Sequence, residues 1–433
     1  MTMLMSLEKQ AFELDAADPQ PTRRAEFCVP PFEREAGATV AACEAAYMAG
    51  NSLGLQPKAL RERLGAELDD WARLGVEGHV KARRAWLPYH KLLREPAARL
   101  VGARPEEVVV MNSLTINLHL LMVSFYRPTP DRPAILIEDS AFPSDSYAVR
   151  SQAAFHGFDP DTAVIRLAPR PGEAALRTDD VLSYLAAHGS RIALVLLGAV
   201  NYFTGELLDI DAITAAGRAE GAVVGWDLAH AAGNVPLRLH DSGADWAAWC
   251  SYKYLNSGPG SLGGVFVHER HLTDRGLPKL AGWWSTDPLT RFAMAPTVTP
   301  VDTADSWQVS NPPIFAMAPV LVSLEMFDET GMPALRAKSV RLTGYLESLL
   351  DEVSAARPAE VITPRDPDQR GAQLSVRISD RDVGPVADRL RQEFGVYADA
   401  RRPDVIRLAP TPMYNTFHDC WRAATALAEV LDD

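Results

Sequence analysis

The chain lacks two features that would define a membrane or nucleic-acid-binding protein. Its most apolar run, IALVLLGAV at 192–200, is far shorter than the ~20 residues that a helix needs to cross a bilayer. It has no excess of positive charge, because 43 basic residues face 56 acidic ones and the net charge is −13. Such a balance disfavours a nucleic-acid backbone or an anionic membrane as the main partner. We therefore expect no nucleic-acid partner and no membrane partner.

Cysteine is scarce as well, with four residues in the chain, at positions 28, 43, 250 and 420. They show no paired spacing of the metal-binding or redox kind, which indicates reduced thiols and predicts neither a structural disulfide nor a metal site. The stretch MTMLMSLEKQAFELD meets its first charge after seven residues, so it lacks the apolar core of a secretory signal. The expected location is the cytoplasm.

Beyond these absences the composition is that of a folded globular protein, with 47% hydrophobic and 23% charged residues in 433. From about residue 108, short apolar runs alternate with longer mixed segments, a pattern typical of parallel strands joined by crossover helices. One such helix is predicted from Thr178, as its cap, to Gly189. The predicted strands are AILIED (134–139), TAVIRLA (162–168), IALVLLGAV (192–200), AVVGWDLAH (222–230), ADWAAWCSY (244–252) and GGVFVHE (263–269).

The character of the chain changes after Pro312 and Pro313. Two long helical stretches follow, at 315–331 and 338–353, and then isolated strands at 373–379 and 405–410. A chain of this length is too long for one compact core. We predict an N-terminal segment (1–50) that packs with the small domain, a large domain (51–310) and a small α+β domain (311–433).

Two polar residues stand where the predicted strands of the large domain end. Asp227 ends the core strand AVVGWD, and Lys253 follows the next strand 26 residues later. Ligands of open α/β sheets bind at the carboxyl ends of the strands. A buried carboxylate there needs a cation or a hydrogen-bond donor. A plain ion pair between the two residues would satisfy this need, and so would a shared ligand site.

The surroundings of Lys253 favour a ligand site. Tyr252 and Tyr254 flank the lysine, and the following NSGPGSLGG can bring backbone close to an anion. Upstream, Asn112 and Ser113 are candidate caps of a helix whose N-terminus suits a phosphate. An acid for a pyridine nitrogen, a lysine for a Schiff base and a helix end for a phosphate together describe a pyridoxal-phosphate (PLP) site.

Ten stretches of the chain, in order from residue 50 to residue 415, resemble the kynureninase family of PLP enzymes. The resemblance implies the PLP-dependent transferase fold of type I: an α/β large domain with a mostly parallel seven-stranded sheet and a smaller α+β domain. The matching stretches are GNSLGLQPK (50–58), EGHVK (77–81), MNSLTINLHLL (111–121), FPSDSYA (142–148), FTGE (203–206), WDLAHAAGN (226–234), WCSYKYLNSGPG (249–260), GWW (282–284), SNPPI (310–314) and IRLAPTPMYN (406–415).

By this resemblance, Lys253 is the Schiff-base lysine, Asp227 the partner of the pyridinium nitrogen and Tyr252 a proton relay, and these three are the expected catalytic residues. Phe142 resembles the aromatic residue that stacks on the cofactor ring. The positions that match cofactor contacts are Leu114, Thr115, Phe142, Pro143, Ser144, Asp145, Asp227, His230, Tyr252, Lys253, Trp283 and Asn311.

The resemblance also implies substrate residues and a partner. Arg407 matches the residue that clamps the α-carboxylate, and its planar fork suits a bidentate pair. His79 and Asn311 match positions near the aromatic end of the substrate. Trp283 and Asn311 match positions that reach the cofactor from the other subunit, which implies a homodimer with shared active sites.

The implied reaction is hydrolysis of L-kynurenine, or of its 3-hydroxy form, to L-alanine and the corresponding anthranilate, in tryptophan degradation or on the way to NAD. The chain departs from the family pattern in WWST, with Ser285 and Thr286, and in Tyr202 followed by Phe203. The first departure bears on substrate-ring preference and the second on a phosphate or relay hydroxyl.

Other readings stay open at this point. The enzyme could act on a substituted kynurenine in secondary metabolism, could be another class V PLP enzyme such as a cysteine desulfurase, or could be a non-catalytic binding module of the same fold. Taken singly, His230 also fits a hydrogen-bonded core histidine, His79 an exposed loop residue, Arg407 a surface charge, and Trp283 a packing residue.

Overall fold

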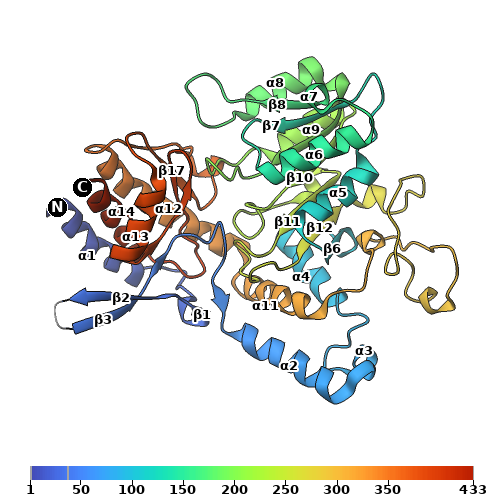
Figure 1. The fold of residues 1–433 in the computed structure, drawn as a ribbon, viewed down its shortest axis with the longest axis horizontal. Coiled ribbons are helices and arrows are strands. Elements are labelled where there is room, and N and C mark those ends of the chain that lie inside the picture. The colour runs from blue at the N-terminus through green and yellow to red at the C-terminus, as the bar shows by residue number, and fades with distance from the viewer. Residues whose placement is uncertain (1, 37–38, 433) are drawn as a thin grey trace. The chain divides into compact units, whose positions relative to one another are not determined.

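The computed structural model describes residues 2–36 and 39–432. The chain forms two compact units: unit 1 comprises residues 1–58, 203–207 and 330–433, and unit 2 comprises 59–202 and 208–329. Both are seen in Figure 1. The boundary between the large domain and the C-terminal small domain lies near residue 330 rather than at the predicted 310, because helix α11 (Ile314–Thr330) is held within unit 2. Its Ser323 hydroxyl donates to the Leu255 carbonyl, and its Glu325 carboxylate pairs with Arg63 at 2.7 Å.

Unit 2 is built on one seven-stranded sheet, as the resemblance predicts. β12 runs antiparallel to both of its neighbours, whereas the other adjacent strands pair in parallel, so the sheet is mostly parallel. The strands, in their order across the sheet, are β6 (Val108–Met111), β12 (Gly263–Val267), β11 (Trp246–Cys250), β10 (Val223–Asp227), β9 (Ile192–Gly198), β7 (Ala134–Glu138) and β8 (Val164–Leu167).

The strands are continuous apolar runs because helices cover the sheet and leave little of it exposed. The predicted helix at 178 is confirmed as α8, but Arg177 holds the N-cap position and Thr178 is the first helical residue. The Thr178 hydroxyl instead accepts the Asp209 amide at 3.3 Å. The helices of this unit are α2 (Ala59–Leu74), α3 (Gly78–Lys81), α4 (Lys91–Val101), α5 (Leu114–Phe125), α6 (Pro143–Phe155), α7 (Pro160–Ala163), α8 (Thr178–His188), α9 (Ile210–Ala219), α10 (Leu239–Ser242) and α11.

Unit 1 has an antiparallel sheet of four strands with helices packed on it, which matches the expected α+β character. The sheet order is β13 (Ala359–Val361), β14 (Leu374–Ile378), β17 (Val405–Leu408) and β16 (Asp399–Arg401). The helices are α1 (Thr2–Ala16), α12 (Met332–Ser354), α13 (Val383–Phe394) and α14 (Phe417–Asp432).

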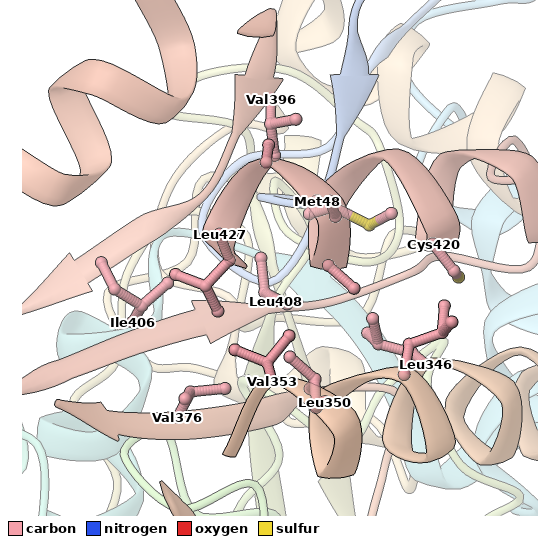
Figure 2. Packing of buried hydrophobic residues seen from close by; sticks show 14 of the residues in the cluster. Met48, Leu346, Leu350, Val353, Val376, Val396, Ile406, Leu408, Cys420 and Leu427 are labelled. Atoms are coloured by element: carbon pink, nitrogen blue, oxygen red, sulfur yellow. The ribbon is translucent and has the colours of Figure 1, made fainter. Parts of the chain in front are cut away.

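The core of unit 1 lies between this sheet and α12 and α14 (Figure 2). The labelled side chains include Leu346 and Leu350 of α12, Leu427 of α14, and Ile406 and Leu408 of β17, and all five are fully buried. Truncation of such a leucine to alanine costs about 2–5 kcal/mol, because the cavity it leaves is only partly refilled. This core fixes β17, the strand that carries Arg407.

Residues 1–58 belong to unit 1, where Ala11 and Met48 are part of the same core. Their strands form small two-stranded pairs: β1 (Phe27–Cys28) with β5 (Gln56–Pro57), β2 (Pro31–Ala36) with β3 (Thr39–Glu44), and β4 (Ala46–Tyr47) with β15 (Val396–Tyr397). Across the described parts of both units, no helix combines the length and apolarity needed to span a membrane.

Candidate active site

A cavity of about 140 Å³ opens in unit 2 at the carboxyl ends of β7, β9 and β10. Parallel strands place their last residues at one edge of a sheet, so the polar residues that end these runs meet there. The cavity is lined by Ser113, Leu114, Thr115, Glu138, Phe142, Ser144, Asp145, Gly198, Val200, Tyr202, Asp227, Ala229, His230, Tyr252 and Lys253.

Lys253 lies just after β11 and points into this cavity. Its Nζ is 3.0 Å from Nε2 of His230, 5.9 Å from the centre of the Phe142 ring and 5.8 Å from that of Tyr252. The neighbours of the Lys253 ammonium group are therefore a histidine and two aromatic rings rather than a carboxylate, although Asp227 lines the same cavity. This geometry does not match the plain ion pair that the sequence left open.

Three carboxyl groups face the cavity from different elements: Asp227 at the end of β10, Glu138 at the end of β7 and Asp145 in the first turn of α6. Burial, reinforced by the negative charge of Asp227, raises the pKa of Asp145 well above its usual range. Burial also raises the pKa of Glu138 to about 7. The raised pKa values show that burial, together with the neighbouring Asp227 charge, disfavours the ionised forms of Glu138 and Asp145 in this cavity.

The carboxylate of Asp227 is held in place from its own chain. It is 8% exposed, and its Oδ1 accepts the Ala229 amide at 2.8 Å. In the parallel ladder Asp227 is opposite Gly198 of β9 and Ala248 of β11. This placement at the end of a central strand fixes the direction in which the acid presents its remaining oxygen.

The N-terminus of α5 forms another wall of the cavity. Ser113 is its N-cap residue, with extended backbone, and no hydrogen bond joins the Ser113 side chain to the helix. The predicted capping position is thus confirmed, whereas its side-chain bond is not seen. The first amides of any α-helix lack acceptors within the helix and attract anions. Leu114 and Thr115 bring these amides to the cavity, which suits a phosphate.

Phe142 immediately precedes α6 and presents its ring to the cavity, 40% exposed. The ring of Tyr202 meets it edge-on at 5.0 Å. Pro143 occupies the first turn of α6, where its fixed φ suits a helix start, and it does not line the cavity. A planar ligand between Phe142 and the strand ends could therefore stack on the Phe142 ring, which Tyr202 holds by an edge-on contact.

The glycine-rich segment after Lys253 has another use than the predicted approach to an anion. No residue from 256 to 264 is among those lining the cavity in the described chain. A Cβ on Gly264 would lie 2.2 Å from the Trp249 ring, and one on Gly263 would lie 2.6 Å from the Trp249 carbonyl. These glycines let β12 pack closely against β11.

Four other predicted residues are not among those that line this cavity. His79 is exposed on α3 with its ring against Trp86 at 5.5 Å, and Trp283 is 39% exposed beside Phe292. Asn311 is exposed in unit 2, just before α11. Arg407 belongs to unit 1, is 1% exposed and forms an ion pair with Asp399. Their predicted roles remain predictions.

The two departures noted in the sequence are local structural features. The Ser285 hydroxyl accepts the Gly282 amide at 3.0 Å and donates to the Gln308 carbonyl at 2.7 Å. The Thr286 hydroxyl accepts the Thr299 amide at 3.0 Å. Phe203 belongs to unit 1, where its carbonyl accepts the Ser375 hydroxyl. Both hydroxyl groups of WWST are therefore engaged in holding their own loop.

Sequence reasoning missed Glu138 and Gly198. Glu138 follows the apolar residues AILI and ends β7 in the same way that Asp227 ends β10, so the strand-end rule applied to Asp227 would have found it. Gly198 carries no side chain to attract attention. Its role comes from its place opposite Asp227 in the sheet, which no local pattern reveals.

The residues present fit PLP: a lysine for its aldehyde, an acid at a strand end for its ring nitrogen, an aromatic ring, and helix amides for its phosphate. The fold agrees, since the structure is similar to that of the cystine C-S lyase C-DES in complex with cysteine persulfide. The TM-score is 0.77 at 18% sequence identity, covering 89% of this chain and 97% of that one. The protein is a PLP-dependent enzyme of fold type I.

Sequence comparisons then define the family. The chain is 67% identical to a kynureninase of Salinispora tropica over 99% of its own length and 98% of the relative's. It is 54% identical to a kynureninase of Koribacter versatilis over 96% of each chain. The model of the kynureninase C-terminal domain matches residues 335–427. The chain belongs to the kynureninase family, and it is a hydrolase that acts on carbon–carbon bonds.

Proposed function

We propose that the protein hydrolyses the Cβ–Cγ bond of L-kynurenine, of 3-hydroxy-L-kynurenine or of both, to L-alanine and the matching anthranilate. The observation that carries this proposal is the cavity that unites Lys253, Asp227 and the α5 N-terminus in a chain 67% identical to a kynureninase. The roles that follow are assigned to residues of this chain and are supported by their positions.

Asp227 and Lys253 divide the work at the cofactor. When bound, PLP supplies an electron sink that stabilises negative charge on the carbon atoms next to the substrate nitrogen. Asp227 holds a proton on the ring nitrogen and so keeps that sink effective. Lys253 would bind the cofactor aldehyde and would move the α-proton of the substrate, and its Nζ lies 3.0 Å from His230 Nε2, a neighbour that can orient it.

Tyr252 is suited to deliver a proton to the departing carbon or to the substrate carbonyl. Burial raises the pKa of its hydroxyl above the ordinary value, so that the group keeps its proton at neutral pH. A group that stays protonated can act as a donor, and the ring lines the cavity beside Lys253.

Arg407, His79 and Asn311 are proposed to bind the substrate. A guanidinium that is 1% exposed and paired with Asp399 is held in a fixed orientation, as a bidentate clamp on an α-carboxylate requires. His79 and Asn311 are exposed polar residues of unit 2, available to the substrate's aromatic end.

The proposed assembly is a homodimer in which Trp283 and Asn311 of one subunit reach the active site of the other. An apolar segment around Trp283 supports it: Leu289 is 92% exposed, Met294 72% and Phe292 65%. Monomeric proteins rarely leave such a continuous apolar stretch uncovered. Lys253→Ala and Trp283→Ala proteins, each inactive alone, should regain turnover when mixed under subunit exchange, because one of the two mixed sites then lacks neither residue.

The desulfurase alternative is disfavoured by the cysteines. Cys250 lies in β11 and Cys420 in α14, both buried, and burial raises the pKa of both thiols. Cys28 and Cys43 are exposed but lie in β1 and β3. A desulfurase needs a reactive thiolate that can travel, and these four positions do not supply one.

The deciding experiment measures anthranilate fluorescence after L-kynurenine is added to the purified protein loaded with PLP. A rapid rise is expected, and Lys253→Ala should abolish it. Lys9→Ala is the matched control, since the Lys9 side chain is 84% exposed on α1. A Lys253→Ala protein that still turned over kynurenine would overturn the assignment.

The preferred ring is tested with the same protein. Initial rates with L-kynurenine and with its 3-hydroxy form give the ratio of kcat/KM values. The proposed setting is tryptophan degradation in the cytoplasm, whether catabolic or toward NAD. A loaded enzyme that binds PLP yet cleaves neither compound would instead point to a further substituted kynurenine.

A further inference from the structure

Glu138 stands next to the acid that is proposed to hold the cofactor ring, but on a different strand. It is the last residue of β7, and its side chain crosses to β9, where both carboxyl oxygens receive the Gly198 amide, at 3.2 and 3.3 Å. Gly198 in turn lies opposite Asp227 in the parallel ladder. One bridging residue therefore separates the two carboxyl groups, and both line the same cavity.

A side chain on residue 198 would have to displace the Glu138 carboxyl group. A Cβ on residue 198 would lie 2.9 Å from Oε1 of Glu138, closer than Cβ atoms come to other heavy atoms. The carboxyl group is 6% exposed. The position of the carboxyl group is thus set by burial and by the hydrogen bond from the Gly198 amide.

Acidic groups and basic groups both lie around Glu138, and Lys253 and His230 line the same cavity. Asp227 on β10 repels its ionised form, and Arg166 on β8 is an exposed residue whose positive charge offsets this only in part. Asp145 on α6 adds a third acid, and β9 contributes only the Gly198 amide. Burial is the largest cause of the raised pKa of Glu138, about 7, so the group can change its charge near neutral pH.

We propose that Glu138 is a third acidic residue of the cofactor site, a positioning residue that acts through Asp227. By gaining or losing a proton, its carboxyl group changes how strongly the pocket retains a protonated pyridine ring. The inference rests on the proposed pairing of Asp227 with that ring. No bond of the substrate is made or broken by Glu138.

The affinity of the pocket for the cofactor should therefore depend on pH, because Glu138 can gain or lose a proton. When Glu138 is ionised, a second fixed negative charge stands near the ring nitrogen and favours its protonated form, because charges interact strongly in a partly buried site. When Glu138 is protonated, Asp227 alone supplies that charge. The pocket should therefore hold PLP more tightly above neutral pH than Asp227 alone would allow.

The test compares Glu138→Gln with the parent protein. Each apoprotein is titrated with PLP, and the dissociation constant is read from protein fluorescence and visible absorbance at about pH 6 and about pH 8.5, on either side of the carboxyl titration. We expect nearly equal dissociation constants at the lower pH and roughly ten-fold weaker binding by the variant at the higher pH. Asp139→Asn is the control, because that exposed acid is adjacent in sequence and does not line the cavity.

Two results would overturn the proposal: a ratio of dissociation constants that is the same at both pH values, or a loss with Asp139→Asn as large as that with Glu138→Gln. A loss independent of pH would mean that Glu138 only supports the fold. If Glu138→Gln does not fold, Gly198→Ala and Glu138→Asp replace it. The first should weaken the pH dependence by displacing the carboxyl group, and the second should retain it.

A third variant separates this proposal from the function on which it rests. Asp227→Asn should bind PLP weakly at both pH values. If Asp227→Asn bound PLP as tightly as the parent, the pairing of Asp227 with the ring, and not only the part played by Glu138, would be wrong.

Discussion

Buried acids lie at both ends of the strands in the large sheet, and the two groups differ in their hydrogen-bond and ion-pair partners. At the carboxyl edge, Glu138 and Asp145 have raised pKa values and line the cavity. At the amino edge, Glu107 precedes β6 and Asp245 precedes β11. Glu107 and Asp245 accept hydrogen bonds from other groups of the protein, and neither residue lines the cavity.

Both carboxylate oxygens of Glu107 accept hydrogen bonds. Its Oε1 accepts the Glu269 amide at 2.7 Å and Nδ1 of His240 at 2.9 Å, while its Oε2 accepts the Arg104 amide at 2.8 Å. With His268, whose Nδ1 accepts the Arg270 amide at 3.3 Å, these side chains resemble a metal-ligand set. Both oxygens of Glu107 and the Nδ1 atoms of His240 and His268 already take part in hydrogen bonds, so we interpret the cluster as a structural network.

Asp245 shows the same pattern with charged partners. Burial by itself raises the pKa of this carboxyl, but hydrogen bonds from His271, the Val224 amide and Arg270 outweigh it and lower the pKa below the ordinary value. The lesson is that buried acids matched by the protein hold the fold together. Acids left short of cations mark the place where a cationic ligand completes the charge balance.

The largest effect is expected when the carboxylate of Asp245, at the amino edge, is removed. Asp245→Asn leaves Arg270 and His271 without their counter-charge, which should lower the free energy of unfolding by about 3 kcal/mol. Urea denaturation of the apoprotein measures this loss. Asp227→Asn, at the other edge, should cost little or nothing in the same experiment. An equal loss from both variants would erase the difference between the edges.

The reciprocal change should appear in catalysis. Asp227→Asn is expected to reduce kcat/KM for kynurenine by about a hundred-fold, because the ring nitrogen loses the acid that keeps it protonated. Initial rates at saturating PLP measure it. Asp245→Asn, assayed at a temperature where it remains folded, should retain most of its turnover. A comparable loss of activity in that variant would show that the amino edge also serves the chemistry.

The pH dependence of apoprotein stability should separate the edges again. The folded pKa of Glu138, about 7, lies above its ordinary 4.5, so its contribution to stability is full below about pH 4.5 and is lost as the pH rises through 7. Glu138→Gln should remove this loss, on the order of 1–3 kcal/mol. The folded pKa of Asp245 is lowered, so its contribution is lost only as the pH falls below the ordinary value of 3.8.

Denaturation curves from about pH 3 to pH 9 measure both limbs. Asp245→Asn should flatten the acid limb alone, and Glu138→Gln the neutral limb alone. If either variant flattened both limbs, the two carboxyl groups would be coupled and the separate treatment of the edges would not hold.

The smallest effect is expected at His268. Burial, aided by the charge of Arg270, lowers the pKa of this imidazole to about 4 from 6.5, so it is neutral at working pH. Its contribution is therefore present above 6.5 and is lost as the pH falls toward 4. Because the ring is partly exposed, His268→Gln should change stability by less than about 1 kcal/mol, as urea midpoints near pH 7 and pH 5 would record. A large loss near pH 7, or tight binding of added zinc by the parent but not by the variant, would contradict the structural reading of this cluster.

Much of the fold is predictable from this sequence because its signals are local. The apolar runs ending at Asp227 and Glu138 are strands, as predicted, since only a sheet covered by helices has use for such runs. The cap of α8 was misplaced by one residue because the Thr178 hydroxyl binds the distant Asp209 amide, a contact that no local pattern contains.

The candidate site also has residues that local sequence signals predict and residues that they do not. The sequence by itself determined most of the residues that line the cavity around Lys253 and Asp227, because those residues follow strand ends or begin helices, where position in the chain implies position in a parallel sheet. Only the tertiary structure decided that a single strand, β9, separates the strands of Glu138 and Asp227, and that Glu107, His240 and His268 meet at the far edge. These groups are distant in sequence, and only the order and direction of the strands bring them together.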